Sequence, residues 1–453
     1  MAPSYQSAVE QLYELGHELA STPSHKFDLA HMRVLLRALG DPQRNFRSVL
    51  IAGTNGKGST AATLASILQA AGHRTGLYTS PHLMRVNERI RVDGKEITEP
   101  DFALSHDRTE HLANWLVSRG ELPWHPSFFE MLTAMTFEHF ARSGIEIGVL
   151  EVGMGGRLDA TNVVEPLVSL ITDISLDHQK FLGNTIAEIA AEKAGIIHEG
   201  GLVVTLPQHP QANDVIGRVV LERNATAVNA ACYVPPVTPG VAGTVWDPRR
   251  QAEHWARSRY PLQVMGKEIT VDSPLVGRHQ LRNLALAIAA AEELNRLGIS
   301  ISPDAIERGI RETRWPGRFQ VIPPSSGLPE MVFDVAHNPA GAWALRAALS
   351  ERFEGRRITL LFGVLRDKAV GEIAEILFPL AEQVIATGVD NPRSASPEEI
   401  WDAAAKTGAE VATEPEFGKA MELAAKTATT SGLLVATGSI YLVGAALQWL
   451  KSR

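Results

Sequence analysis

Residues 53 to 59 read GTNGKGS and combine two features that hold phosphate in proteins, a glycine-rich turn and a lysine. The apolar run SVLIA precedes this stretch, and TAATLASILQAAG, with small and apolar residues at helical spacing, follows it. This order predicts a strand, a turn and the start of a helix, where backbone N–H groups and the helix dipole attract anions. We expect a phosphate site with Lys57 on the outer phosphates and Ser59 as a second side-chain contact.

The spacing of this turn departs from the usual phosphate loop, G-x-x-x-x-G-K-[ST]. Ile51 stands where that pattern needs glycine, and Gly58 separates Lys57 from Ser59. The alternative interpretation is a purely structural strand-to-helix turn.

Three further predicted strands end in side chains that could bind a cation. Ser80 follows a short strand in LYTSPHL, Glu151 ends the strand in GVLEVG, and His178 follows LITDIS. Ligands of open parallel sheets collect beyond the carboxyl ends of the strands, so these side chains could hold Mg²⁺ beside the phosphates. Taken singly, each has a structural alternative: a turn residue, a hydrogen-bonded strand end and a loop histidine.

Lys193 lies on the apolar stripe of a predicted helix, between Ile186 and Ile189 at about 100° per residue, whereas Glu188 and Glu192 share another face. A lysine that faces a core is partly neutral, snorkels, forms an ion pair or is chemically modified. A neutral amine can react with carbon dioxide to form a carbamate, which binds metal. Periodicity alone favours snorkelling or pairing.

The elements that must position these residues alternate between strand and helix in both halves of the chain. This alternation predicts an α/β fold with a mostly parallel sheet, and a second, smaller α/β domain near the C-terminus. The length of 453 residues supports two domains, residues 1–298 and 299–453. Residues 206 to 262 are predicted to leave the main sheet, with a hairpin that turns at Gly266 and Lys267 shortly after them.

Composition excludes several classes of protein. A net charge of -8, without a basic stripe, argues against nucleic-acid binding. The single cysteine, Cys232, cannot form an internal disulfide, and the N-terminal residues lack the pattern of a signal peptide, so we expect a cytoplasmic protein. The uncharged stretch GLLVATGSIYLVGAALQWL is interpreted as a strand, a Gly-Ser turn and a helix rather than a membrane span.

The motifs in order resemble one enzyme family: GTNGKGS, TSPHL with VNERIRV, PSFFEMLTAMTFEHF, EVGMGGRLDATN, DHQKFLG, EKAGI, GRHQLRNLALA, RWPGRF and DVAHNPAG. They look like folylpolyglutamate synthase, with or without dihydrofolate synthase activity, in the superfamily of the Mur ligases. The resemblance implies a P-loop-type central domain like that of Mur ligases, followed by a Rossmann-like C-terminal domain. It also implies that ATP lies between the two domains.

The resemblance also implies roles for single residues. Ser80, Glu151 and His178 match the magnesium ligands, and Lys193 matches a carbamylated lysine, which replaces the preference from periodicity. His337 matches a residue near the glutamate or the transferred phosphate, with a turn-stabilising role as the alternative. The implied ATP contacts are Thr54, Asn55, Gly56, Lys57, Gly58 and Ser59 in the turn, Asn283 near adenine, Arg318 on phosphate and Asp334 on ribose. A helix cap, a surface salt bridge and a turn residue are the respective alternatives for Asn283, Arg318 and Asp334.

The pterin side of the implied site combines aromatic residues with a carboxylate, which suits a flat heterocycle with N–H donors. The matching residues are Phe128, Phe129, Glu130, Leu158, Asp159 and Ala160, with residues 25 to 27 as a weaker match. Phe128, Met131 and Leu132 also share helical spacing, so a core helix is an equal alternative.

The implied reaction joins L-glutamate to the carboxylate of a folate or of dihydropteroate, with ATP as co-substrate, Mg²⁺ and a lysine carbamate. The implied catalytic residues are Lys57, Lys193, His178 and His337. We expect a monomer without nucleic-acid or membrane partners. A Mur-type cell-wall ligase and a P-loop regulatory ATPase are the alternatives; the pterin-side motifs disfavour the first, and a requirement for an acceptor would exclude the second.

Overall fold

The computed structural model describes residues 4–16, 29–236, 257–325, 327–429 and 431–453, which form two compact units. Unit 1 contains the described residues up to 235, together with 261–270 and 282–313. Unit 2 contains residues 236, 257–260 and 271–281 and the described residues from 314 to the C-terminus.

Unit 1 is built on an eight-stranded sheet in the order β4-β3-β2-β5-β1-β6-β7-β8. Strands β2, β5, β1, β6, β7 and β8 are parallel, whereas β3 and β4 pair antiparallel at one edge. The strands are β1 Arg47–Ala52, β2 Thr75–Tyr78, β3 Ile90–Val92, β4 Lys95–Glu96, β5 Ile147–Glu151, β6 Val168–Ile171, β7 Leu202–Thr205 and β8 Thr226–Asn229. The carboxyl ends of β2, β5, β1 and β6 therefore meet at one edge of the sheet, which we call the ligand edge.

Helices cover both faces of this sheet, so its central strands β5, β1 and β6 are buried almost throughout. In β1, Leu50 and Ala52 join the core cluster that also contains residues of α1, α2, α4 and α5, while Val49 and Ile51 are equally buried. Helix α3 packs on β1, β2 and β5, and α10 packs on α3. The helices are α1 Tyr5–Glu14, α2 Leu29–Ala38, α3 Lys57–Ala70, α4 Glu99–Ser118, α5 Phe128–Ser143, α6 Gln179–Leu182, α7 Ile186–Ala194, α8 Pro210–Glu222, α9 Arg278–Arg296 and α10 Pro303–Glu312.

Unit 2 contains a six-stranded sheet in the order β11-β12-β16-β13-β14-β15. Only β11 runs antiparallel to its neighbour; the other pairs are parallel. Its strands are β11 Gln320–Ile322, β12 Glu330–Phe333, β13 Ile358–Phe362, β14 Gln383–Ala386, β15 Val411–Thr413 and β16 Leu433–Thr437. Its helices are α11 Pro339–Arg352, α12 Val370–Leu377, α13 Pro397–Ala404, α14 Phe417–Ala428 and α15 Ile440–Lys451. Two mostly parallel α/β sheets confirm the predicted fold class.

The segment 206 to 262 corrects one prediction. Helix α8 and strand β8 lie within it, and β8 pairs parallel to β7 at the edge of the main sheet. The prediction of an excursion is therefore wrong for this part, because the edge strand β8 is largely exposed and lacks the apolar run that marks a buried strand. The remainder of this segment includes residues 237–256, which lie outside the described residues.

The predicted hairpin is present as β9 Ser258–Val264 and β10 Lys267–Ser273, which form a two-stranded sheet. Its turn residues are Met265 (φ +50°) and Gly266 (φ +76°), one position earlier than predicted. Positive φ at both central residues is the pattern of the tight hairpin turn that matches the twist of the strands.

The uncharged stretch near the C-terminus folds as predicted, with β16 followed by the turn and by α15. Ser439 caps α15 by accepting a hydrogen bond from the backbone N–H of Leu442. None of the helices in the described ranges combines the length and the apolar character needed to cross a membrane.

Candidate functional site

The GTNGKGS stretch forms the predicted strand-turn-helix, with β1 ending at Ala52 and α3 beginning at Lys57. Gly53 and Gly56 have φ of +152° and +90°, and a Cβ at Gly53 would lie 1.8 Å from Thr172 Oγ1. Glycine is therefore required at both positions. The N-cap residue of α3 is Gly56, which makes no side-chain cap hydrogen bond, and the positive end of this helix dipole lies at the turn. This is the local geometry of a phosphate site.

The loop after β6 holds this turn in place. The carbonyl of Asp173 accepts hydrogen bonds from the backbone N–H groups of Thr54 (2.9 Å) and Asn55 (3.2 Å). The hydroxyl of Thr54 donates to Ser175 O (3.0 Å) and accepts from Ser175 N (3.1 Å). Four contacts between two adjacent strand ends fix the backbone of the turn without using the lysine.

Lys57 and Lys193 converge on the same atom of this turn. Lys57 Nζ donates to Gly53 O at 3.2 Å, and Lys193 Nζ donates to Gly53 O at 2.7 Å. Periodicity alone favoured snorkelling or pairing; Lys193 is 4% exposed, so its amine does not snorkel to the surface, and its hydrogen-bond partner here is a carbonyl. Burial, followed by the positive charge of Lys57, lowers the pKa of Lys193 to about 7.

The sequence of α7 explains why Lys193 points inward. Thr185 and Glu188 form a reciprocal capping box at the start of this helix, which fixes its register. Ile189, Ala190 and Lys193 are then buried on the same helix.

Ser80 and Glu151 also meet at the ligand edge. Glu151, at the end of β5, is 4% exposed and accepts a hydrogen bond from the backbone N–H of Ser80 at 3.2 Å. His178 is the N-cap residue of α6, with φ of +50°, and its backbone N–H donates to Asp177 Oδ1 at 2.8 Å.

The described ranges contain no group of three or more His, Cys, Asp or Glu side chains that could hold a metal ion. The predicted magnesium set includes only two residues of those types, Glu151 and His178. Its other members are the hydroxyl of Ser80 and Lys193 as a carbamate. A buried carboxylate and a hydroxyl are hard oxygen donors of the kind that Mg²⁺ takes, so the chemistry of the predicted set fits this ion.

Asn283 lies against the phosphate turn, although 227 residues separate it from Gly56 in the sequence. A Cβ at Gly56 would lie 2.1 Å from Asn283 Oδ1, and Asn283 is 3% exposed. The hydroxyl of Thr60, in the first turns of α3, donates to Asn283 O at 3.4 Å. The buried face of α9 therefore packs directly on the start of α3.

The three predicted site residues of unit 2 are Arg318, Asp334 and His337. They lie in two loops, which the carboxylate of Asp334 joins by hydrogen bonds. Asp334 follows β12; its Oδ2 accepts from Phe319 N at 2.8 Å and its Oδ1 accepts from Ala336 N at 2.9 Å. Arg318 precedes Phe319, and His337 uses Nδ1 to donate to Val335 O at 2.9 Å. Asp334 and His337 thus have the turn-stabilising contacts that were their alternatives, and Asp334 holds the Arg318 loop beside the His337 loop.

The predicted pterin residues have unequal surroundings. Phe128 is 3% exposed, belongs to the core of unit 1 and stacks on Tyr13 with ring centroids 5.6 Å apart. Phe129 is half-buried, and a Cβ at Gly153 would lie 2.4 Å from its ring. Glu130 accepts hydrogen bonds from Ser127 N (2.8 Å) and Oγ (2.6 Å) in a capping box at the start of α5.

Asp159 organises the loop that contains Leu158 and Ala160. Its Oδ2 accepts from Gly153 N and Met154 N at 3.0 and 3.1 Å, and its Oδ1 accepts from the N and Oγ1 of Thr161. Burial raises the pKa of Asp159, and these four hydrogen bonds oppose that rise. The carboxylate is therefore a loop-forming group; residues 25 to 27, the weaker pterin match, lie outside the described residues.

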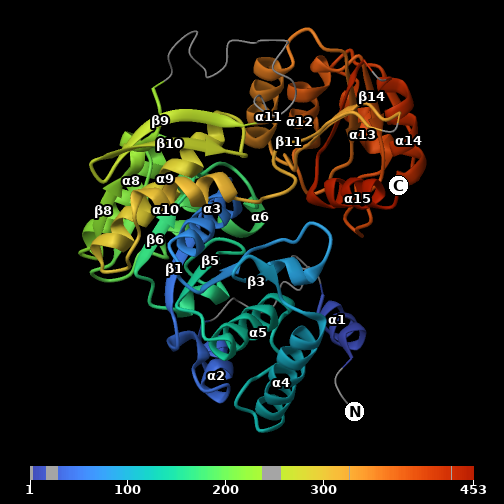
Figure 1. Ribbon diagram of the computed structural model, residues 1–453. Coiled ribbons are helices and arrows are strands. Elements are labelled where there is room, and N and C mark those ends of the chain that lie inside the picture. Colours follow the sequence, from blue (N-terminus) through green and yellow to red (C-terminus); the bar gives the residue numbers. More distant parts are fainter. Residues whose placement is uncertain (1–3, 17–28, 237–256, 326, 430) are drawn as a thin grey trace. The chain divides into compact units, whose positions relative to one another are not determined.

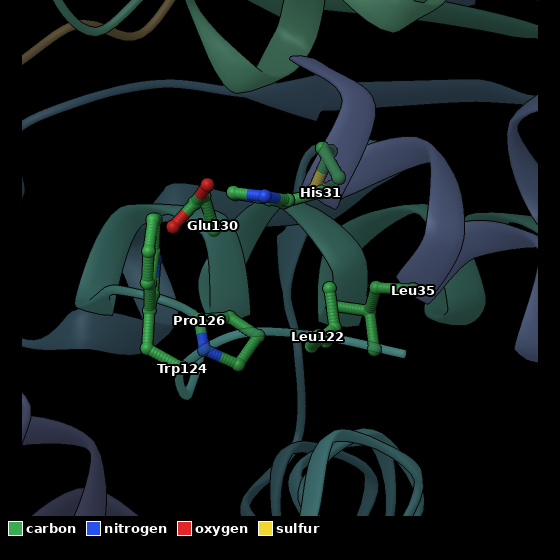
Figure 2. Close-up of a pocket in the computed structure, with 7 residues that line it drawn as sticks. His31, Leu35, Leu122, Trp124, Pro126 and Glu130 are labelled. Atoms are coloured by element: carbon green, nitrogen blue, oxygen red, sulfur yellow. The ribbon is translucent and has the colours of Figure 1, made fainter. Parts of the chain in front are cut away.

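Figure 2 shows a pocket beside Glu130, with the rings of His31 and Trp124 at its wall. The two rings meet edge to face, with centroids 4.9 Å apart. The cavity volume available to the centre of a water molecule is about 10 Å³. This is enough for about one water molecule and too little for a bicyclic ring. This pocket is therefore too small to be the pterin site as it stands.

Comparison with known proteins identifies the family. The Mur ligase middle domain matches residues 128–291, and the Mur ligase, glutamate ligase domain matches residues 317–440. The dihydrofolate synthase/folylpolyglutamate synthase of Bacillus subtilis is 34% identical over 429 residues, covering 93% of this chain and 95% of that protein. The folylpolyglutamate synthase of Lacticaseibacillus casei is 34% identical over 439 residues, covering 95% of each. The chain belongs to the folylpolyglutamate synthase/dihydrofolate synthase family.

A solved structure of this family has the same fold. Folylpolyglutamate synthase from Mycobacterium tuberculosis, complexed with ADP and AMPPCP, superimposes with a TM-score of 0.85 at 33% identity, covering 99% of each chain. The predicted resemblance is thereby confirmed, as are the Mur-type middle domain and the C-terminal domain with its second sheet.

Two carboxylates beside the candidate site were not predicted from the sequence. Glu88 accepts hydrogen bonds from the backbone N–H groups of Leu83, Met84 and Arg85 at 2.8 to 3.0 Å, and so shapes the loop after Ser80. The Asp177 side chain is 8% exposed, and its negative charge favours the ammonium form of Lys193. Both residues could have been found from the sequence, because each is an acidic residue inside a motif: Glu88 in VNER and Asp177 in LDH.

Proposed function

We propose that the protein is an ATP-dependent ligase that joins L-glutamate to the carboxylate of a folate, of dihydropteroate, or of both, with release of ADP and phosphate. The observation that carries this function is the convergence of Lys57 and Lys193 on Gly53 O, beside a helix start whose N-cap residue is a glycine. Two amines at one carbonyl place nitrogen donors beside the turn, as a site for a polyphosphate requires. The family membership selects folate ligation among the reactions that use such a site.

The chemistry follows from the poor reactivity of a carboxylate towards amines. In the proposed reaction, the carboxylate oxygen of the pterin substrate attacks the γ-phosphorus of ATP, the bond to ADP breaks, and an acyl phosphate forms. Lys57 and the N–H groups of the turn stabilise the charge on the phosphoryl oxygens. The glutamate amine then attacks the acyl carbon, and the tetrahedral intermediate releases phosphate and a proton to give the amide. Catalysis rests on positioning, for which effective molarities reach about 10⁵ to 10⁸ M.

Magnesium is the proposed cation, held by Ser80, Glu151, His178 and Lys193 as a carbamate; when bound, it neutralises charge on the phosphates. The carbamate forms when the neutral amine of Lys193 adds to carbon dioxide, making an N–C bond and releasing one proton. Support for a neutral amine comes from the pKa of about 7 that burial gives Lys193.

The remaining contacts are proposed from the family resemblance and from the surroundings described above. Residues Thr54 to Ser59 hold the phosphates, Asn283 lies near adenine, Arg318 contacts phosphate, Asp334 contacts ribose and His337 acts near the glutamate or the transferred phosphate. Phe128, Phe129, Glu130, Leu158, Asp159 and Ala160 form the pterin side. Of the two phenylalanines, half-buried Phe129 has the surface to contact a ligand, while Phe128 supports it from the core.

The proposed division of labour follows the two halves of the chain. Residues 1–298 bind ATP and the pterin, and residues 299–453 form the C-terminal domain of the glutamate ligase type. We infer a cytoplasmic monomer whose partners are its small-molecule substrates, without nucleic acid or membrane.

The test offers purified protein ATP, Mg²⁺ and L-glutamate with dihydropteroate or, in parallel, with tetrahydrofolate, and resolves the products by mass. We expect a product heavier by one glutamate residue with at least one acceptor, and ADP released in equal amount. ADP release at full rate without any acceptor would contradict the proposal and support a regulatory ATPase. Lys57→Ala should abolish product formation, whereas Lys419→Ala, at a side chain that is 71% exposed in unit 2, should not.

A further inference from the structure

Arg282 and Asp173 form a paired contact beside the phosphate turn that none of the roles assigned above uses. Arg282 Nε lies 2.9 Å from Asp173 Oδ2 and 3.1 Å from Oδ1, and Arg282 Nη2 lies 2.5 Å from Oδ1. The guanidinium therefore engages both carboxylate oxygens, the arrangement that fixes orientation as well as distance. Arg282 Nη2 also donates to Pro207 O at 2.9 Å, which joins the pair to the chain that follows β7.

Both partners are directly attached to parts of the proposed nucleotide site. The backbone carbonyl of Asp173 accepts the N–H groups of Thr54 and Asn55, so moving Asp173 moves the phosphate turn. Arg282 immediately precedes Asn283, whose side chain lies against Gly56. The pair thus links the loop after β6, which holds the phosphate turn, to helix α9, which carries the proposed adenine contact.

We propose that Arg282 and Asp173 are positioning residues for ATP, which hold the phosphate turn and Asn283 at the spacing that one nucleotide requires. This inference rests on the proposed function, because it assigns the turn to phosphates and Asn283 to adenine. Neither residue need touch the nucleotide.

The solvent exposure of the two side chains distinguishes a positioning role from a role in the stability of the fold. The side chains of Arg282 and Asp173 are 30% and 36% exposed. Ion pairs whose side chains are exposed to this extent contribute little to the free energy of unfolding. The loop also keeps other anchors, since Gln208 Nε2 donates to Thr172 O and Gln208 Oε1 accepts from Ile174 N. Breaking the pair should therefore leave the fold and change the geometry of the turn.

Arg282→Lys is the informative variant because lysine keeps the charge and loses the planar fork. We expect this variant to bind ADP with Mg²⁺ at least about fivefold more weakly by calorimetry and to raise KM for ATP to a similar extent, with KM for glutamate unchanged. Asp173→Asn should have an effect of the same size. In the double variant the two effects should not multiply, because both break one contact.

Arg356→Lys is the matched control. Arg356 Nη1 lies 2.9 Å from Glu330 Oε2 and its Nη2 donates to Gly432 O, with side-chain exposures of 35% and 10% for Arg356 and Glu330. This pair lies at the amino ends of β12 and β16 in unit 2, opposite the strand ends that carry Asp334 and the Gly-Ser turn. The control should bind ADP as the parent protein does.

Two results overturn the inference: ADP affinity of Arg282→Lys within twofold of the parent, or effects that multiply in the double variant. Urea unfolding of each variant shows whether loss of affinity follows from loss of fold; an equal loss of stability and affinity would also count against positioning. Failure of the parent protein to bind ADP at all would instead refute the proposed function, so the two failures are distinguishable.

Discussion

Buried charge is arranged differently at the ligand edge and between helices α4 and α5, although both regions belong to unit 1. At the ligand edge, the amines of Lys57 and Lys193 approach one carbonyl. Between α4 and α5, the buried carboxylate of Glu138 accepts from Ser105 Oγ at 2.6 Å and pairs with Arg108 at 2.9 Å and Arg142 at 3.4 Å. Arg142 in turn pairs with Asp101 at 2.8 Å.

The difference shows how to separate function from stability among buried polar residues. A carboxylate surrounded by donors has paired its charge within the protein, so it serves the fold. Two amines that converge on one carbonyl repel each other when both are charged, and an anionic ligand compensates this repulsion when it binds. Substitutions in the two regions should therefore have opposite signatures in assays of activity and of unfolding.

Lys193→Ala should produce the largest effect. We expect kcat to fall by about 10²-fold or more, because the variant removes a charged group from the site of phosphoryl transfer. The free energy of unfolding should change little, since the loss of packing is offset by removal of a desolvated amine. Steady-state kinetics and urea unfolding, with Lys419→Ala as the exposed control, measure the two quantities; full activity in the Lys193 variant would refute a role in the site.

Glu138→Gln should show the opposite result, a loss of stability with little change in activity. The amide keeps the shape but loses the charge that Arg108 and Arg142 contact, so the free energy of unfolding should fall by about 1–3 kcal/mol. Because this group lies between α4 and α5, away from the proposed contacts, kcat and KM should remain within twofold. A large loss of activity without loss of stability would break the comparison.

Gly56→Ala tests the ligand edge through its backbone. The new Cβ would meet Asn283 Oδ1 at 2.1 Å, in a backbone conformation with φ of +90°. We expect KM for ATP to rise about tenfold, equivalent to about 1.4 kcal/mol. Gly72→Ala is the matched control, because its φ is +93° but no described atom lies within 4 Å of the added Cβ. The control carries the same backbone strain of about 1 kcal/mol and should leave KM unchanged; an equal change in both would exclude the Asn283 contact as the cause.

The smallest expected effect is a pH dependence in the α4–α5 region. Burial, then the positive charge of Arg142, lowers the pKa of His139, while Asp101 and Glu138 oppose this. In the unfolded chain, histidine takes up its proton near pH 6.5, before the folded protein does. Stability is therefore fully present above about pH 6.5 and is lost as the pH falls towards the lower pKa of the folded state.

His139→Gln should reduce this acid-induced loss of stability by up to about 1 kcal/mol, measured by urea unfolding at about pH 7.5 and about pH 5.5. His111→Gln, at an exposed position of α4, is the control. An unchanged pH dependence in the His139 variant would show that this histidine does not contribute.

The parts of the site that lie within one motif were predictable because their physics is local. The GTNGKGS turn and the position of Lys193 on the buried face of its helix follow from residue spacing within about 15 residues. The turn of the β9–β10 hairpin was misplaced by one residue because Gly266 was assigned to the wrong turn position. Strand β8 was missed because edge strands need no continuous apolar run.

The sequence by itself determined the alternation of strands and helices, the strand-turn-helix of the phosphate site and, through its motifs, the family. These depend on neighbouring residues, whose side-chain period and backbone conformation are set locally. Only the tertiary structure decided that Lys57 and Lys193 share Gly53 O, that Asn283 lies on Gly56 and that Arg282 pairs with Asp173. Those contacts depend on the order of strands in the sheet and on how helices pack over it, because packing joins residues that more than a hundred positions of chain keep apart.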